Sequence, residues 1–142
     1  MKTKLQGSPR IYLYRRVVQA KLFIDRNFAG KIDLDNIADE AAFSKFHFIR
    51  LFKEIYGKTP HQYLISVRIE KAKELMQRGN SVSGSCMSVG FESLTSFSAL
   101  FRKVVGVSPS SYLQAQMQRN VAMAKVPLGF IPNCFAEAKG WK

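Results

Sequence analysis

Basic side chains are the chemically active groups that this sequence supplies in greatest number, and two of them recur at matched positions. The chain of 142 residues carries 22 lysines and arginines against 10 acidic residues, a formal net charge of +12. Lys53 and Arg102 hold equivalent places in two copies of one pattern, FSKFHFIRLFKEIYGKTPHQYL at 43–64 and FESLTSFSALFRKVVGVSPSSYL at 91–113. Such an excess of positive charge indicates an anionic polymer or surface as the partner.

The two copies also match in their aromatic and turn residues. Four pairs lie 49 positions apart: Phe52 with Phe101, Gly57 with Gly106, Pro60 with Pro109, and Tyr63 with Tyr112. Upstream, Phe43 and Phe91 lie 48 apart, so the second copy has one extra residue between its first and second helices. A repeat in fixed register predicts one structural unit used twice.

Other chemistries find little support. Cys86, Cys134, His47 and His61 show no metal-ligand spacing, and neither paired carboxylates, a Cys/His dyad nor a phosphate-cradling glycine loop is recognisable. We therefore expect no enzyme, no cofactor and no metal, and disfavour a ligand-binding module. No apolar run approaches the roughly 18 residues of a spanning helix, and the N-terminus lacks a signal-peptide core. We therefore expect that the protein does not associate with a membrane. We expect it to be cytoplasmic and associated with the nucleoid.

Helical periodicity covers the first half of the chain. Residues 10–28 place apolar side chains three or four apart, and a short helix should begin near Asp33 or Asp35. A helix from Lys45 to about Tyr56 follows, ended by Gly57. The expected buried residues are Leu13, Val17, Ala20, Ile24 and Phe28, then Leu34, Ile37, Ala38 and Ala41, then Phe48, Leu51, Phe52 and Ile55.

The second half repeats this order after a longer helix at about 61–78, which would span about 27 Å at ~1.5 Å per residue. Helices are expected at 82–88, at 93 or 94–105 with Phe97, Leu100, Phe101 and Val104 buried, and from Pro109 to about Asn120. With no strand signal, the fold class is all-α, about seven helices in two helix-turn-helix subdomains joined by a long central helix. The predicted segments are a basic flexible arm at 1–9, the first subdomain at 10–59, the linker helix at 60–79, the second subdomain at 80–120 and an irregular tail at 121–142.

Two short helices joined by a tight turn form the helix-turn-helix pattern, whose second helix enters the DNA major groove. The combined motif resembles the DNA-binding domain of the AraC/XylS family over about residues 10–115: Leu34-Asp35-x-x-Ala38, Arg50-x-Phe52-Lys53-x-x-x-Gly57-x-x-Pro60-x-x-Tyr63-Leu64, Arg68-Ile69-x-x-Ala72-x-x-Leu75, and Val89-Gly90-Phe91 followed by Phe101-Arg102-Lys103-x-x-Gly106-x-Ser108-Pro109. The resemblance implies two recognition helices that enter successive major-groove segments on one face of the duplex.

The resemblance also implies which residues face the bases: Phe46, Ile49 and Arg50 in the first recognition helix, and Thr95, Ser96, Ser98 and Ala99 in the second. Arg50 could donate two hydrogen bonds to guanine, and Phe46 and Ile49 could touch thymine methyl groups. The alternatives are a phosphate or solvent contact for Arg50, helix packing for Phe46 and Ile49, and capping or packing for Thr95 and Ser96.

Phosphate contacts are expected from Ser44, Lys45, Lys53, Arg102 and Lys103. The second recognition helix is chemically poorer, so we expect the first to read most bases and the second to anchor the protein, because phosphate contacts position without specifying. The second copy also departs from the family in its short helix. Gly84 should cost about 1 kcal/mol of helix propensity, and Ser85 replaces an apolar core residue; Cys86 is expected to be a buried packing residue.

These inferences predict a sequence-specific, double-stranded-DNA-binding transcription regulator of bacterial type. We expect a monomer on DNA, a dimer only within a longer chain, and RNA polymerase as a partner implied by the resemblance alone. Two alternatives remain: a non-specific nucleic-acid-binding protein, or the C-terminal DNA-binding module of a longer sensor-regulator.

Overall fold

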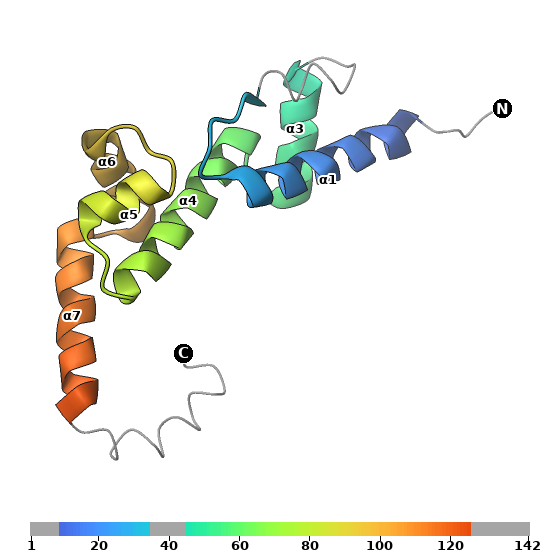
Figure 1. The fold of residues 1–142 in the computed structure, drawn as a ribbon. Helices are drawn as coiled ribbons and strands as arrows, with labels where there is room; N and C mark the ends of the chain where they lie inside the picture. Colours follow the sequence, from blue (N-terminus) through green and yellow to red (C-terminus); the bar gives the residue numbers. More distant parts are fainter. Residues whose placement is uncertain (1–8, 35–44, 126–142) are drawn as a thin grey trace, which may run out of the picture.

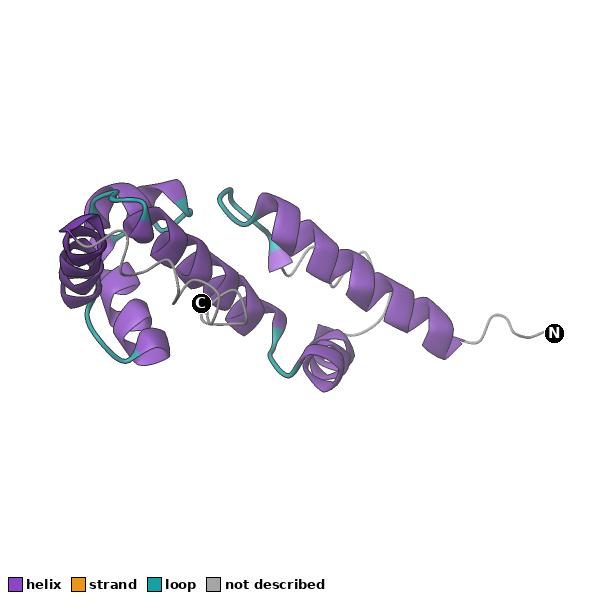
Figure 2. Ribbon diagram, turned by 90° about the horizontal axis from the view of Figure 1, so that it is seen from below, coloured by secondary structure: helices purple, strands orange, loops and turns teal. Residues whose placement is uncertain are grey.

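The computed structural model describes residues 9–34 and 45–125, and the regular structure in these ranges is helical. The helices are α1 (Pro9–Asn27), α3 (Lys45–Tyr56), α4 (Pro60–Gln77), α5 (Val82–Ser88), α6 (Leu94–Val105) and α7 (Pro109–Lys125). Figure 2 shows helices and connecting loops without strands over the coloured part of the chain. The all-α prediction is confirmed. The short helix expected after Asp33 falls largely on 35–44, outside the described residues.

The long helix α4 connects two groups of helices. Figure 1 shows α1 and α3 beside the first part of α4, and α5, α6 and α7 around its second part. Every extensive contact between described helices lies within one group or involves α4. We call α1 with α3 the first unit and α5 with α6 and α7 the second unit. The predicted arrangement of two subdomains on one central helix is therefore present.

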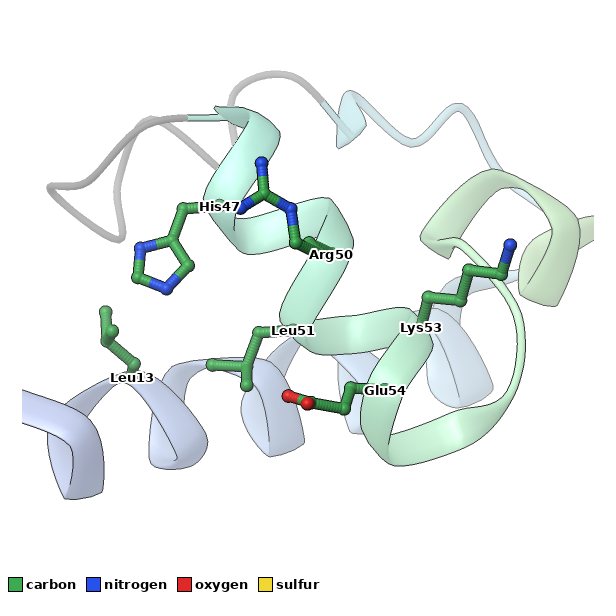
Figure 3. Close-up of a pocket in the computed structure, with 6 residues that line it drawn as sticks. All are labelled: Leu13, His47, Arg50, Leu51, Lys53 and Glu54. Atoms are coloured by element: carbon green, nitrogen blue, oxygen red, sulfur yellow. The ribbon is translucent and has the colours of Figure 1, made fainter.

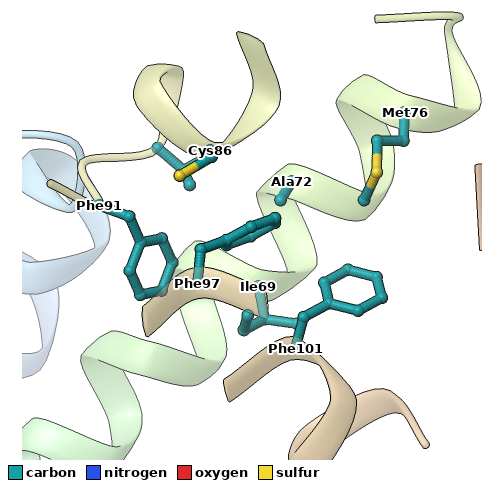
Figure 4. Close-up of a cluster of buried hydrophobic side chains, with 8 residues drawn as sticks. Ile69, Ala72, Met76, Cys86, Phe91, Phe97 and Phe101 are labelled. Atoms are coloured by element: carbon teal, nitrogen blue, oxygen red, sulfur yellow. The ribbon is translucent and has the colours of Figure 1, made fainter. Parts of the chain in front are cut away.

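Each unit has its own hydrophobic core. The first consists of Val17, Ala20, Ile24, Phe48, Leu51, Phe52 and Leu64. The second, drawn in Figure 4, consists of Ile69, Ala72, Met76, Cys86, Val89, Phe91, Phe97 and Phe101. Because α4 supplies Leu64 to one core and Ile69, Ala72 and Met76 to the other, it is a structural member of both units.

The repeat in sequence is also a repeat in packing. Tyr63 meets Phe52 edge-on with ring centroids 5.8 Å apart, and Tyr112 meets Phe101 in the same way at 5.5 Å. Such aromatic pairs contribute about 0.5–1.5 kcal/mol beyond the area they bury. The matched aromatic residues therefore hold α3 against α4 and α6 against α7.

Two predicted core residues lie on the surface instead. Ile55 is 36% exposed and Val104 is 50% exposed, whereas their neighbours Tyr56 and Val105 pack against the cores. The positions three and four residues beyond Phe52 and Phe101 lie on almost the same helical face, so periodicity alone cannot choose between them. The last turn of both helices turns the later residue inward.

Helix ends follow the sequence signals. Thr59 caps α4 through a capping box with Gln62, while Ser81 and Ser93 cap α5 and α6. Gly106 ends α6 in the left-handed conformation, with φ of 99°. The expected end of the last helix near Asn120 is wrong, because α7 continues to Lys125. Residues 116–125 contain neither glycine nor proline, so nothing in that stretch terminates the helix.

The departure at Ser85 has a visible structural cost. Its side chain is fully buried, and Oγ has no hydrogen-bond partner in the described part of the chain. Ser85→Ala should therefore raise the free energy of unfolding by about 1 kcal/mol, because it removes an unsatisfied buried hydroxyl without adding volume. Urea denaturation measures this, with exposed Ser88→Ala as control. Destabilisation by Ser85→Ala would show that the hydroxyl does have a partner.

Replacing Gly84, the residue before Ser85, would disturb the cap of α5. A Cβ there would lie 2.9 Å from Ser81 Oγ, the atom that accepts the capping hydrogen bond from the Gly84 N–H. The helix-propensity gain of about 1 kcal/mol from Gly84→Ala is therefore offset by displacement of the cap.

A polar link joins α1 to α4 in the first unit. Tyr63 Oη donates to Asp25 Oδ1 at 2.5 Å, and Lys21 Nζ lies 2.8 Å from Asp25 Oδ2. Burial alone would raise the pKa of Asp25, but the hydrogen bonds from Lys21 and Tyr63 outweigh it and hold that pKa below its ordinary value. The stability from this ionised form is present above the unfolded pKa of about 3.9 and is lost as pH falls through the folded pKa.

Tyr63→Phe should therefore lower the free energy of unfolding by about 1 kcal/mol at pH 7, with the difference shrinking below about pH 4. Tyr112→Phe is the matched control, because Tyr112 Oη accepts from Gln77 Nε2 at 2.7 Å and no acid is involved. Denaturation of both variants at pH 7 and pH 3 gives the comparison. A Tyr63→Phe effect that stays the same at both pH values would contradict a role for the ionised Asp25.

Candidate nucleic-acid interface

The outer face of α3 presents basic and aromatic side chains together. Phe46 is 75% exposed, and Arg50 and Lys53 are exposed one and two turns later. Figure 3 shows Arg50 and Lys53 directed away from α1, while Leu51 points toward it. The side chains of Arg50 and Lys53 make no hydrogen bond or ion pair with another described residue. Both cations are thus placed to meet an anionic ligand without breaking an internal contact.

Ile49 occupies a different environment from the other two predicted base-facing residues of α3. It is half-buried and packs against the first core, as the packing alternative anticipated. Lys45 is exposed at the first position of α3. Ser44, the other predicted phosphate contact at this end, lies outside the described residues.

The outer face of α6 carries small side chains. Thr95, Ser96 and Ala99 are exposed and Ser98 is half-buried. The Ser96 N–H is engaged by the Ser93 cap at 3.2 Å, but its hydroxyl is not part of that bond. Arg102 and Lys103 are exposed in the last turn, as Lys53 is in α3. The repeated feature of the two outer faces is therefore a basic C-terminal turn, whereas long side chains earlier in the helix occur on α3 alone.

A groove of about 1390 Å³ lies between the two units, with Arg68 of α4 in its lining. Lys45 and Ile49 line it from α3, and Ser96 of α6 lines it together with Ser93, the cap of that helix. The start of α4, at Thr59–His61, lines it as well. Three helix N-termini therefore open onto one groove, and such ends favour negatively charged groups through the helix dipole. The groove also includes the acids Asp33 and Glu92, so its charge is mixed.

A second, smaller hollow of about 550 Å³ lies between α1 and α3. Arg50, Lys53 and Glu54 line it together with His47, Leu51 and Leu13 (Figure 3). This hollow lies beside the outer face of α3 and borders the same surface.

Within 9–34 and 45–125, no group of three or more His, Cys, Asp or Glu side chains is arranged to hold a metal ion. None of the helices described is long and apolar enough to cross a bilayer.

Several groove residues have no role predicted from the sequence, notably Lys31, His61 and Arg68. Arg68 could have been noticed, because it is a charged residue beside Ile65 and Ile69 on the inner face of the central helix. Lys31 and His61 carry no such signal. Their place in the groove depends on how the two units meet.

A family model described as a helix-turn-helix domain matches residues 37–115, more than half of the chain. Among curated proteins, the MmsAB operon regulatory protein of Pseudomonas aeruginosa is 35% identical over 97 residues, covering 68% of this chain and 32% of that protein. The HTH-type transcriptional activator AarP of Providencia stuartii is 34% identical over 92 residues, covering 64% of this chain and 68% of AarP. The chain thus spans about a third of one relative and two thirds of the other.

Solved structures with the same fold include a DNA complex. The DNA-binding domain of AdpA bound to a target DNA is 29% identical, with a TM-score of 0.61, covering 75% of this chain and 94% of that one. A probable AraC family transcriptional regulator from Rhodopseudomonas palustris has a TM-score of 0.63 at 24% identity, covering 72% and 97%. At that identity the second likeness shows the fold alone.

Proposed function

Because the chain belongs to the AraC/XylS family of helix-turn-helix transcription regulators, we propose that it binds one asymmetric double-stranded DNA site through α3 and α6 and regulates transcription there. The observation that carries this proposal is the outer face of α3, where Phe46, Arg50 and Lys53 are all exposed beside the groove. We expect the protein to act by binding, without a catalytic step.

Within this proposal, α3 enters one major-groove segment and reads its bases. Arg50 donates two hydrogen bonds to a guanine, and Phe46 contacts a thymine methyl group. Ile49, being half-buried, supports the helix and touches the base edges only with its exposed part. Lys45 and Lys53 contact phosphates on either side, which fixes the helix in register.

The second unit anchors the protein in the next major-groove segment. Arg102 and Lys103 contact phosphates, and Thr95, Ser96, Ser98 and Ala99 approach the base edges with groups too short for two-point recognition. The phosphate backbone between the two segments passes along the groove that the three helix N-termini share. Specificity is therefore unequally divided between the two helices.

The proposal is tested by selecting bound duplexes from random DNA with the 142-residue chain. Dissociation constants are then measured for the selected duplex and for a scrambled duplex of equal composition at one salt concentration. A specific regulator should favour the selected site by roughly 10³-fold or more. A ratio near one would leave the non-specific nucleic-acid-binding function in its place, which the net charge of +12 alone could support.

A monomer carries both recognition helices, so we expect one protein molecule per DNA site. Light scattering of the purified complex gives the stoichiometry. Two molecules on one selected duplex would mean that each uses a single recognition helix.

A further inference from the structure

We propose that Arg68 is a positioning residue that fixes the separation of the two recognition helices, and with it the number of base pairs between the two segments of the DNA site. This inference rests on the proposed function. Arg68 lies near the middle of α4, where the first core gives way to the second.

Arg68 connects the two units directly. Its Nε donates to the Phe28 carbonyl at 2.6 Å, and its Nη2 donates to the Gly30 carbonyl at 2.9 Å, just beyond the end of α1. On the other side, its guanidinium carbon lies 5.7 Å from the centre of the Phe91 ring, a member of the second core. One planar group thus holds backbone of the first unit and an aromatic ring of the second, a use that suits arginine's fork of donors.

The same backbone meets the second unit at Gly90. A Cβ at Gly90 would lie 2.8 Å from the Ala29 carbonyl oxygen and 3.1 Å from that of Phe28. Gly90 also has a φ of 97°, which side chains rarely allow. The turn before α6 therefore lies directly on the segment 28–30 that Arg68 holds, and the Phe28 side chain packs against both cores.

This contact matters because little else joins the units apart from α4. Helices α1 and α3 do not pack extensively against α5, α6 or α7. The 18 residues of α4 span about 27 Å, and long helices bend gently. One base pair along the duplex is about 3.4 Å, so a small bend or twist of α4 would move α6 by a base-pair step relative to α3. The contact between Arg68, residues 28–30 and Gly90 resists that movement.

The test measures the binding of Arg68→Met to three duplexes: the selected site, and the same site with one base pair inserted or deleted between its two segments. Arg78→Met is the matched control, because Arg78 is an exposed arginine at the end of the same helix. The wild-type chain and Arg78→Met should favour the selected spacing by roughly 10- to 100-fold, the range of a base-pair mismatch. Arg68→Met should reduce that preference to about threefold or less.

Folding of each variant is checked by circular dichroism. If Arg68→Met does not fold, Arg68→Lys replaces it; the lysine keeps the charge but lacks the planar fork, so its spacing preference should fall at least about threefold. Equal weakening on all three duplexes, with the spacing preference intact, would overturn the inference and assign Arg68 to stability or to a phosphate contact. A wild-type chain that does not distinguish the selected from the scrambled duplex would instead overturn the proposed function.

Discussion

Replacing Phe101 with alanine is expected to lower the free energy of unfolding by about 3–5 kcal/mol, a large part of the 5–15 kcal/mol that stabilises a typical domain. Phe101 is fully buried in the second core, where its ring lies 5.6 Å from that of Phe97 and 5.5 Å from that of Tyr112. Its removal leaves a cavity between α6, α4 and α7. Because this core holds α6 in place, binding to the selected DNA should fall as well.

Val104→Ala is the matched control for Phe101→Ala. Val104 lies on the same helix but is half exposed, so the change in stability should stay within about 0.5 kcal/mol. Urea denaturation followed by circular dichroism measures both variants. Comparable destabilisation by the two would contradict the exposed position of Val104 on α6.

Replacing Arg50 with alanine should cost about 1–3 kcal/mol of binding free energy and should relax base preference at one position of the site. The physical reason is the loss of the two hydrogen bonds that we propose Arg50 donates to one guanine. Lys53→Ala is the comparison, because Lys53 is exposed one turn later on the same helix. It should weaken binding to all sequences alike and flatten the salt dependence by about one phosphate contact.

Competition binding with a panel of single-base-pair variants, repeated at several salt concentrations, separates the two effects. Arg50→Ala should change the ranking of the panel, whereas Lys53→Ala should keep the ranking. If both variants leave the ranking unchanged, Arg50 contacts phosphate and not a base.

The spacing of apolar residues and the residues that start or stop helices were sufficient to predict most of the fold. Val17, Ala20 and Ile24 are buried as their spacing predicts, and α3 ends at Tyr56, directly before the Gly57 that was expected to stop it. These features are local, since each depends on residues within one or two helical turns. The predicted burial of Ile55 and Val104 was wrong, because packing decides whether each of them or the following residue turns inward. In α3, the ring of Tyr56 contacts those of Phe52 and Tyr63.

The relation between the two units could not be predicted in the same way. Gly90 reads in the sequence as a turn residue, but its contact with Ala29 joins positions about 60 residues apart. Arg68 belongs to a recognisable motif, yet only the folded chain brings it to the carbonyl groups beyond α1. The exposed residues of α3 follow from helix phase alone, whereas the groove needs both units in place.

The most direct test of the central claim is a scan of the selected DNA site in which every base pair is changed in turn. Changes in the segment under α3 should each cost about 1–3 kcal/mol of binding free energy, while changes in the segment under α6 should cost much less. Equal costs in both segments, or larger costs under α6, would contradict the division into a reading helix and an anchoring helix.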